Sequence, residues 1–297
     1  MIYDDSNTTL HMVDLAYPDW NFKTITADIL LNGRKDINPR ATYCDGTPAH
    51  TISINHVSQS YDISCGEFPI ISLRPISFKP AIGELLWIYQ DMSNDLTLLE
   101  NKYKVNWWRP WALDDNTIGA CYGYTVKKHD LMNKLLIGLK ENPDGRRHII
   151  NLWQEEDFEM PHALKPCCYQ SVWNIRHEED GDYLDMCMFQ RSADWLVAAS
   201  TTNQVQYATF LCIVAHCLGY KPGVYTWNAA NVHLYDRHID AAKELLKRES
   251  IICNPRVEIN PNKRDFFSLT LDDIKLKQYP IKEIKMINPQ IKLDLGI

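Results

Sequence analysis

Two segments with the composition of β-strands, joined by an acidic turn, constrain the fold of this chain most strongly. Residues 170–176 and 183–190 are rich in apolar and aromatic side chains, and residues 178–182 between them read Glu-Glu-Asp-Gly-Asp. Such a stretch favours a turn between two neighbouring strands. Because segments with helical patterns precede and follow this pair, the sequence predicts an α+β fold with strands clustered centrally and helices around them.

Local patterns predict further helices and strands. Residues 21–33 have helical spacing and stop at Asn32-Gly33, which predicts a left-handed cap. Pro80 opens a helix that is apolar around most of its circumference as far as Tyr89, so this helix is expected to be buried on several sides. Other helices are expected at 131–139, at 204–218 closed by Gly219 and at 236–248, and other strands at 51–58, 148–153 and 225–227.

Length and charge limit the class of protein. A chain of 297 residues can bury one sizeable core, so we expect a single domain over residues 1–297. The 31 basic and 38 acidic side chains give a net charge of -7, which argues against a general affinity for nucleic-acid backbones. Any anion that binds is therefore expected to be held by local arginines.

The cysteine pattern and the lack of long apolar stretches favour a location in the cytoplasm. Nine cysteines are scattered without a C-x-x-C pair, so neither a disulfide framework nor a metal site is expected. The first six residues carry no basic or apolar leader pattern, and no stretch approaches the length of a membrane span. We expect a cytoplasmic protein with no metal and no membrane partner.

Cys167 has the setting of a nucleophile. It follows Pro166 in a loop, and Arg191-Ser192 lies a short way downstream, where positive charge is available to stabilise a thiolate. Most buried cysteines are small apolar side chains, which is our interpretation of the neighbouring Cys168. The pairing suggests covalent catalysis on a phosphate-bearing molecule.

Four arginines in polar or turn-adjacent positions could clamp one phosphate through charge-assisted bidentate bonds; they are Arg40, Arg146, Arg147 and Arg191. For any single one of them, ordinary surface solvation is the alternative. Alternate side chains of a strand point to opposite faces, so only one of the adjacent pair at 146 and 147 can serve the site of its own chain. One of the two is expected to reach across a dimer interface.

Three further groups have both a structural and a functional interpretation. Glu84 lies within an apolar helix, where a lone carboxylate is costly unless it is paired or used. His233 and Tyr235 share one strand face, and they either pack there or reach the same sugar hydroxyl. The tryptophans within residues 107–111 form either core or a flat stacking wall for a bicyclic ring.

Several short segments occur together and in order along the chain. They are Asp45-Gly46-Thr47-Pro48-Ala49-His50, Glu84-Leu85-Leu86-Trp87, residues 108–111, Tyr122-Gly123, Arg146-Arg147, Pro166-Cys167, Gln190-Arg191-Ser192 with Asp194, and His233-Leu234-Tyr235. With these segments the chain resembles the thymidylate synthase family, the folate-dependent type with a cysteine nucleophile, from about residue 40 to the end. The resemblance implies a central mixed β-sheet flanked by helices, with the sheet packing at a homodimer interface.

On the nucleotide side, the resemblance implies conversion of dUMP to dTMP, with Cys167 attacking C6 of the uracil ring. Glu84 would organise proton transfers, and Tyr122 would assist removal of the C5 proton. The phosphate would be held by Arg40, Arg191 and Ser192, together with Arg146 and Arg147 of the partner subunit. His233 and Tyr235 would bind the 3'-hydroxyl of the sugar.

On the cofactor side, the resemblance implies 5,10-methylenetetrahydrofolate as the co-substrate. Asp194 would contact the pterin, and Trp108, Trp111 and Leu164 would line the folate site. The carboxyl-terminal Ile297 would close over it.

The chain departs from the family at residues 197–203, where a loop that usually reads Leu-Gly-x-Pro-Phe-Asn is one residue longer and lacks glycine, proline and phenylalanine. Asn203 is the expected base-reading residue and Thr202 its rival. An asparagine favours uracil, because its amide can accept from N3–H and donate to O4. Asn231 replaces the usual aspartate, and Cys168 a histidine. Two alternatives stay open: a hydroxymethylase of dUMP, dCMP or CMP in which water captures the methylene, and an inactive nucleotide-binding homologue.

Overall fold

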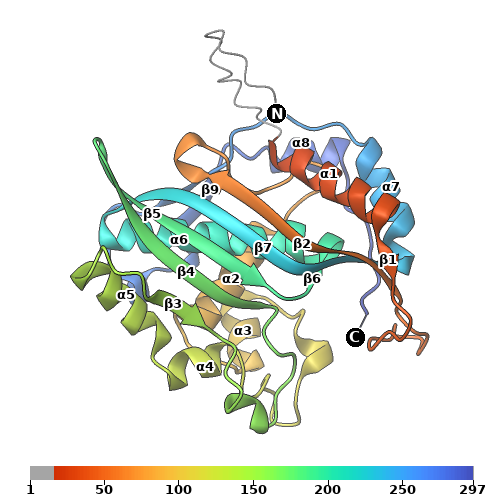
Figure 1. Cartoon of the computed structure of the whole chain (residues 1–297), viewed down its shortest axis with the longest axis horizontal. Helices are drawn as coiled ribbons and strands as arrows, with labels where there is room; N and C mark the ends of the chain where they lie inside the picture. The colour runs from red at the N-terminus through yellow and green to blue at the C-terminus, as the bar shows by residue number, and fades with distance from the viewer. Residues whose placement is uncertain (1–16, 297) are drawn as a thin grey trace.

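A mixed β-sheet forms the centre of the structure, a computed structural model that describes residues 17–296 (Figure 1). Its strands lie in the order β1-β2-β7-β5-β4-β3, with the short β6 beside β7. β5 and β6 run parallel to β7, and the other neighbours are antiparallel. The strands are β1 (Arg34–Lys35), β2 (Thr51–Asp62), β3 (His148–Asn151), β4 (Cys168–Glu178), β5 (Gly181–Gln190), β6 (Ala193–Asp194) and β7 (Lys221–Tyr235), and a separate pair is formed by β8 (Arg256–Ile259) and β9 (Ile274–Lys277).

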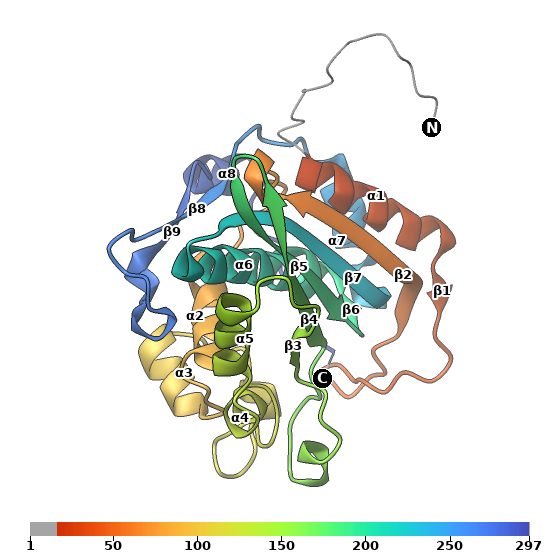
Figure 2. The same ribbon diagram turned by 60° about the vertical axis from the view of Figure 1, so that its left-hand side comes forward.

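Helices pack on one side of the sheet. α6 and α2 lie behind it in Figure 1, and Figure 2 shows α5 and α3 on the same side. Every residue of α6 from Gln204 to Ala215 is buried, so this helix forms the centre of the core. The helices are α1 (Tyr17–Asn32), α2 (Phe78–Tyr89), α3 (Leu96–Tyr103), α4 (Gly123–Lys128), α5 (Leu131–Glu141), α6 (Gln204–Leu218), α7 (Ile239–Lys247) and α8 (Ile281–Ile287).

The two faces of the sheet differ in burial. In β5, Leu184, Met186 and Met188 are buried, whereas Cys187 and Phe189 on the opposite face are only half-buried. The second face is turned to the viewer in Figure 1 and is seen there without a covering helix. This alternation confirms the expected α+β architecture, a mixed sheet with helices packed on it.

Several strands are longer than their local patterns predict. β2 continues from the expected strand at 51–58 to Asp62. The three-residue strand predicted at 225–227 is wrong in extent, because it is the middle of the fifteen-residue β7. Pairing with β2 and β5 extends β7 through Pro222, Gly223 and Asn228, residues that local propensity places outside strands.

The ends of three helices test two predicted caps and one predicted start. Gly219 has φ 84° and ends α6 as predicted. Gly33 does not have a positive φ, so the left-handed cap predicted there is wrong. Glycine is required at this position for space, since a Cβ on Gly33 would lie 2.3 Å from the Ile29 carbonyl oxygen. The helix expected from residue 236 begins at Ile239, after a 3-10 turn over Asp236–His238.

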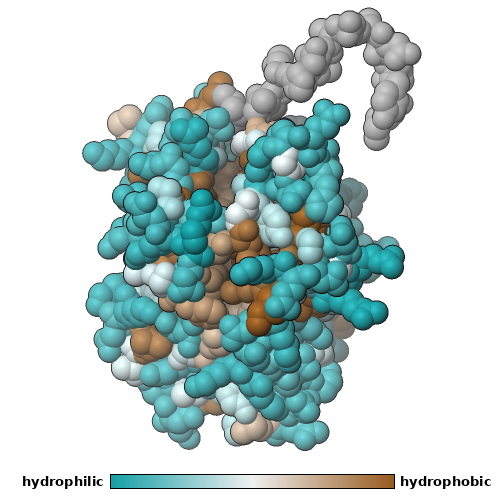
Figure 3. Space-filling model, turned by 90° about the vertical axis from the view of Figure 1, so that its left-hand side faces the viewer, coloured by the Kyte–Doolittle hydropathy of each residue, from teal (hydrophilic) through white to brown (hydrophobic). Residues whose placement is uncertain are grey.

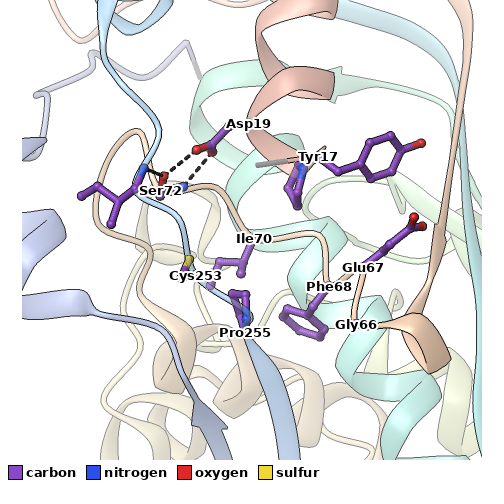
Figure 4. Close-up of a pocket in the computed structure, with 11 residues that line it drawn as sticks. Tyr17, Asp19, Gly66, Glu67, Phe68, Ile70, Ser72, Cys253 and Pro255 are labelled. Atoms are coloured by element: carbon purple, nitrogen blue, oxygen red, sulfur yellow. Dashed lines mark hydrogen bonds between the residues drawn. The ribbon is translucent and has the colours of Figure 1, made fainter. Parts of the chain in front are cut away.

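Buried hydrogen bonds join α1 to two distant segments. The Asp19 carboxylate accepts the backbone N–H of Ser72 at 2.7 Å and also accepts the Ser72 hydroxyl (Figure 4). The Ser72 hydroxyl oxygen accepts the N–H of Ile251 at 2.8 Å. The cavity beside these bonds has a volume of about 20 Å³, which is room for about one water. We therefore assign this cluster a structural role.

The surface is polar over most of the side seen in Figure 3, where apolar side chains gather in a central hollow between polar rims. Among residues 17–296, no helix has both the length and the apolar composition needed to cross a membrane.

Candidate active site

The β4–β5 hairpin brings Cys167 and Arg191 together. Cys168 and Gln190 are Cα partners across the hairpin, so the residues just outside them, before β4 and after β5, become neighbours. The Arg191 N–H donates to the Cys167 carbonyl at 2.9 Å. Strand pairing therefore creates the contact between thiol and guanidinium that the sequence suggests.

The Cys167 thiol lies in a positive but partly desolvated setting. Arg191 Nη2 is 3.8 Å from Sγ, and the guanidinium is held by the carbonyls of Pro166, at 3.0 Å from Nε, and Lys165, at 2.7 Å from Nη2. Burial raises the pKa of Cys167, whereas the charges of Arg191 and the exposed Arg40 lower it. The two arginines therefore favour the thiolate, which is the nucleophilic form.

Tyr122 contacts the Cys167 loop from the other side. It has φ 49° and ψ −111°, outside the regions that non-glycine residues favour. From this strained turn, its Oη accepts the Cys167 backbone N–H at 3.1 Å, and Trp108 packs edge-on against its ring at 5.2 Å. Burial raises the pKa of Tyr122 well above its usual value, so the phenol stays protonated and keeps an O–H to donate.

Glu84 lies on α2 and is 6% exposed. Its Oε1 accepts the indole N–H groups of Trp107, at 2.8 Å, and Trp108, and its Oε2 accepts from Gln206 Nε2. Burial raises the pKa of Glu84, and these three donors lower it by stabilising the carboxylate. A carboxyl group with a raised pKa is suited to proton transfer near neutral pH.

The altered loop forms a π-helical segment, Trp195–Asn203, that leads into α6. A π-helical turn holds more residues than an α-helical turn, so it accommodates the additional residue. Asn203 Oδ1 accepts from Gln190 Nε2 at 3.0 Å, and Asn203 Nδ2 donates to Gln206 Oε1 at 3.3 Å. Thr202 lines a cavity of about 230 Å³ together with Trp107, and it is the hydrogen bonds to Gln190 and Gln206 that make Asn203 the better candidate for reading the base.

His233 and Tyr235 share one face of β7, with ring centroids 5.5 Å apart and ring planes at 90°. His233 Nδ1 lies 2.8 Å from Asn231 Oδ1, so the asparagine still provides a hydrogen-bond partner. Burial lowers the pKa of His233 and raises the pKa of Tyr235 to about 12. Both side chains are therefore neutral at pH 7 and can bind a hydroxyl group.

Asp194 pairs with His233 where β6 joins β7. Its side chain accepts the Val197 N–H at 3.1 Å and caps the π-helical segment. Burial raises the pKa of Asp194, and the nearby His233 and His238 lower it. The expected pterin contact is therefore fixed to the same segment that carries Asn203.

The carboxyl-terminal segment returns to this site. His238 Nε2 lies 2.7 Å from the Asp294 carbonyl oxygen, and a Cβ added to Gly296 would lie 2.5 Å from the Tyr235 ring. Figure 1 shows this last segment of the described chain running close to β6. Ile297 itself lies outside the described residues.

Three other expected residues lie around the same centre. Trp111 packs edge-on against Trp108 with ring centroids 6.0 Å apart, and Leu164 is half-buried against the core. The Ser192 carbonyl accepts from Gln190 Nε2 at 3.1 Å.

Arg146 and Arg147 are not part of this centre. Both are exposed in the segment between α5 and β3. His148, which follows them, is paired with Trp173, roughly 15 Å further along β4 than Cys168. The strand predicted from residue 148 begins at His148, directly after the two arginines, and neither of them is close to the Cys167 of its own chain.

Two polar residues, Gln206 and Arg74, escaped the sequence-based prediction, whereas Trp107 belongs to the tryptophans that the sequence indicates as core or stacking wall. Trp107 donates to Glu84 at 2.8 Å, and Gln206 joins Glu84 to Asn203. Arg74 is 5% exposed, lines the 230 Å³ cavity with Trp107, and has a buried Nε without a partner. Both polar residues lie in otherwise apolar stretches, and buried polar groups are usually satisfied or used, which is the signal that could have identified them.

One cluster among residues 17–296 has the spacing of metal ligands: His129, Glu156 and Asp157. The Lys128 ammonium group lies 2.7 Å from Asp157 and 3.2 Å from Glu156. A cation is thus already paired with the carboxylates, and we assign the cluster a structural role.

The fold and site define an enzyme class, in which a thiol beside an arginine and a buried carboxyl group lie at one end of a mixed sheet. Comparison with known proteins identifies the class. The family model described as thymidylate synthase matches residues 20–290. A thymidylate synthase of Lactococcus lactis subsp. lactis is 43% identical over 286 residues, which cover 95% of this chain and 100% of the relative. One of Streptococcus mutans is 41% identical over 286 residues, with the same coverage of both chains.

A solved structure agrees. The thermostable thymidylate synthase A from Bacillus subtilis superposes with a TM-score of 0.84 at 33% identity, covering 94% of this chain and 99% of that one. The chain belongs to the thymidylate synthase family and is an enzyme of the methyltransferase class.

Proposed function

We propose that this protein converts dUMP to dTMP by reductive methylation at C5, through a covalent bond between Cys167 and C6. The observation that carries the proposal is the Cys167 thiol beside the Arg191 guanidinium, at 3.8 Å. Thymidylate synthase is also the name of the relatives that match nearly the whole chain.

The chemistry requires a nucleophile, because C5 of uracil is a weak nucleophile until C6 is saturated. Attack by the Cys167 thiolate forms the S–C6 bond and moves the C5–C6 electron pair to C5. C5 would then form a bond to the one-carbon unit as the folate nitrogen leaves, and the C5 proton would be lost with the help of Tyr122. A hydride from the same co-substrate would add to the methylene, which expels the thiolate and restores the C5–C6 double bond, while Glu84 organises the proton transfers. Arg40, Arg191 and Ser192 hold the phosphate, His233 and Tyr235 hold the sugar hydroxyl, and Asn203 reads the base.

The residues present fit 5,10-methylenetetrahydrofolate as co-substrate. It supplies the one-carbon unit and the hydride that completes the methyl group. The 230 Å³ cavity is lined by Trp107 and Arg74. The buried guanidinium Nε of Arg74 has no hydrogen-bond partner, and an anionic ligand is a suitable partner for this cation. Trp108, Trp111 and Leu164 would hold the ring system, with Asp194 at the pterin and Ile297 closing the site.

The relatives' names favour the synthase over the two alternatives, and product analysis tests the choice. With dUMP and methylenetetrahydrofolate, we expect dTMP and dihydrofolate in equal amounts, identified by mass spectrometry. A hydroxymethyl nucleotide with tetrahydrofolate would identify a hydroxymethylase instead, and no turnover despite nucleotide binding would identify an inactive homologue.

We further propose a homodimer in which Arg146 and Arg147 of the partner subunit complete the phosphate site. Their distance from Cys167 within one chain and their exposure support this arrangement. The open sheet face, with half-buried Phe189 and Cys187, is a suitable dimer interface.

Mixing two inactive variants tests the dimer. C167A and the R146A/R147A double variant should each be inactive, because one lacks the nucleophile and the other the partner's phosphate ligands. After subunit exchange, each heterodimer holds one intact site, so about one quarter of all sites should be active. Activity that stays at the sum of the two variants would show that the arginines act within their own chain.

We also propose that residues 1–297 form one catalytic domain, since the core residues of the described part form a single cluster. A cytoplasmic location is supported by the free thiols of all nine cysteines, including the exposed Cys44 and Cys65.

A further inference from the structure

Three side-chain amides form a hydrogen-bonded relay between Trp227 and Glu84. Trp227 Nε1 donates to Gln190 Oε1 at 2.9 Å, and Gln190 Nε2 donates to Asn203 Oδ1 at 3.0 Å. Asn203 Nδ2 donates to Gln206 Oε1 at 3.3 Å, and Gln206 Nε2 donates to Glu84 Oε2. We call Gln190, Asn203 and Gln206 the amide relay.

The two ends of the amide relay fix its direction. An indole N–H can only donate, and an ionised carboxylate can only accept. Each amide between them must therefore accept through its oxygen on the Trp227 side and donate through its nitrogen on the Glu84 side. A rotated Asn203 would place two nitrogen donors together at Gln190 and two oxygen acceptors together at Gln206, which loses both hydrogen bonds.

Building on the proposed function, we propose that Gln206 is a positioning residue that fixes the orientation of the Asn203 amide and thereby selects uracil over cytosine. Asn203 keeps one N–H and one oxygen lone pair that the amide relay does not use. The free N–H of Asn203 lies on the side of Glu84, where the proton transfers at C5 of the base take place. It therefore donates to O4 of uracil, which is next to C5. The Asn203 oxygen then accepts from N3–H of uracil. Cytosine presents an amino group and an acceptor nitrogen in these places and requires the rotated amide.

Gln206 also connects Asn203 to Glu84. The side chain is 4% exposed, and its Nε2 has a second acceptor in the Ala81 carbonyl at 2.9 Å, so α6 and α2 are held together at this point. The other groups that face Glu84 are the two indole donors, of Trp107 and Trp108, and the Cys168 thiol of β4. Burial keeps the pKa of Cys168 well above its usual value, so this thiol is neutral.

The same helix supplies a matched control. Gln204 is 3% exposed on α6, accepts from Tyr61 Oη at 3.2 Å and donates to Gln59 at 2.9 Å. Neither of these hydrogen bonds involves a member of the amide relay. Q204L therefore removes a buried amide of the same size and burial without disturbing Asn203 or Glu84.

The test compares Q206L with Q204L. Equilibrium binding of dUMP and dCMP should show that Q206L narrows the ratio of the two affinities by about tenfold, because the rotated amide no longer loses a hydrogen bond at Gln206. The acid limb of kcat/KM with dUMP should move up by about one pH unit, because Glu84 loses a donor that stabilises its charge. Q206E, which keeps the shape of the side chain, should move this limb further, because a second carboxyl group then faces Glu84.

Two results would overturn the proposal. One is an unchanged affinity ratio in Q206L together with an unchanged acid limb in both Q206L and Q206E. The other is a Q204L variant that shifts both quantities as much as Q206L, since loss of a buried amide would then explain the effect. A wild-type protein that forms no dTMP would instead refute the proposed function, so the two failures are distinguishable.

Discussion

Replacement of Cys167 by alanine should abolish dTMP formation, with a loss of about 10⁴-fold or more, as for nucleophiles in other covalent enzymes. No other thiol of the described chain has Arg191 Nη2 as its hydrogen-bonding neighbour. Because the remaining groups still bind and orient the nucleotide, the affinity for dUMP should change much less than kcat. Steady-state kinetics and equilibrium binding of dUMP measure the two effects separately.

The adjacent cysteine provides the control. Cys168 is 5% exposed and faces the core, so C168A should cost about 1 kcal/mol of unfolding free energy but keep the covalent chemistry. Equal activity of C167A and wild type would eliminate the mechanism. An equal loss of dTMP formation in C167A and C168A would show that disturbed packing, and not the missing nucleophile, causes the loss.

Replacement of Glu84 by glutamine should lower kcat by about 10²- to 10⁴-fold, the usual contribution of a positioned acid or base. Glutamine is nearly isosteric, and its oxygen can still accept the indole N–H groups of Trp107 and Trp108, but its amide nitrogen cannot accept from Gln206 Nε2. It cannot transfer a proton, so the loss should appear in turnover more than in nucleotide binding.

The pH profile gives a second readout for Glu84. Burial raises the pKa of Glu84 above its usual value, so the ionised base is lost as pH falls through this raised pKa, and the wild-type acid limb should lie above that of an ordinary glutamate. E84Q should lack this limb. E100Q is the control, since Glu100 forms an ion pair with Arg109 near the surface, and a profile of E84Q identical to wild type would exclude Glu84 as the titrating group.

Much of the fold follows from local patterns. The hairpin of β4 and β5, the buried helix α6 and its Gly219 cap were all predictable, because composition, period and turn residues agree there. β7 was not, since its length depends on strands that are distant in the sequence. Local propensity carries no information about such partners.

The site was predictable to the extent that its residues carry unusual chemistry. Cys167, Glu84 and the arginines stand out from their surroundings, and the structure brings Cys167 and Arg191 into contact. Gln206 and Arg74 show only polarity within an apolar stretch, because their importance depends on burial and on neighbours from other elements.

The loop in which we expect an additional residue relative to the family forms a regular segment. The π-helical segment Trp195–Asn203 accommodates it and still delivers Asn203 to Gln190 and Gln206. Its remaining residues are mostly buried or half-buried against the core. Asn203, the proposed base-reading residue, is therefore held by hydrogen bonds to Gln190 and Gln206.

Cys167 should become covalently attached to the nucleotide during turnover. The most direct test is to denature the protein during reaction with dUMP and methylenetetrahydrofolate and to map the modified peptide by mass spectrometry. We expect the added mass of the nucleotide on the peptide that contains Cys167, both in wild type and in C168A, and no such addition in C167A. Attachment at another residue, or turnover by C167A at the wild-type rate, would contradict it.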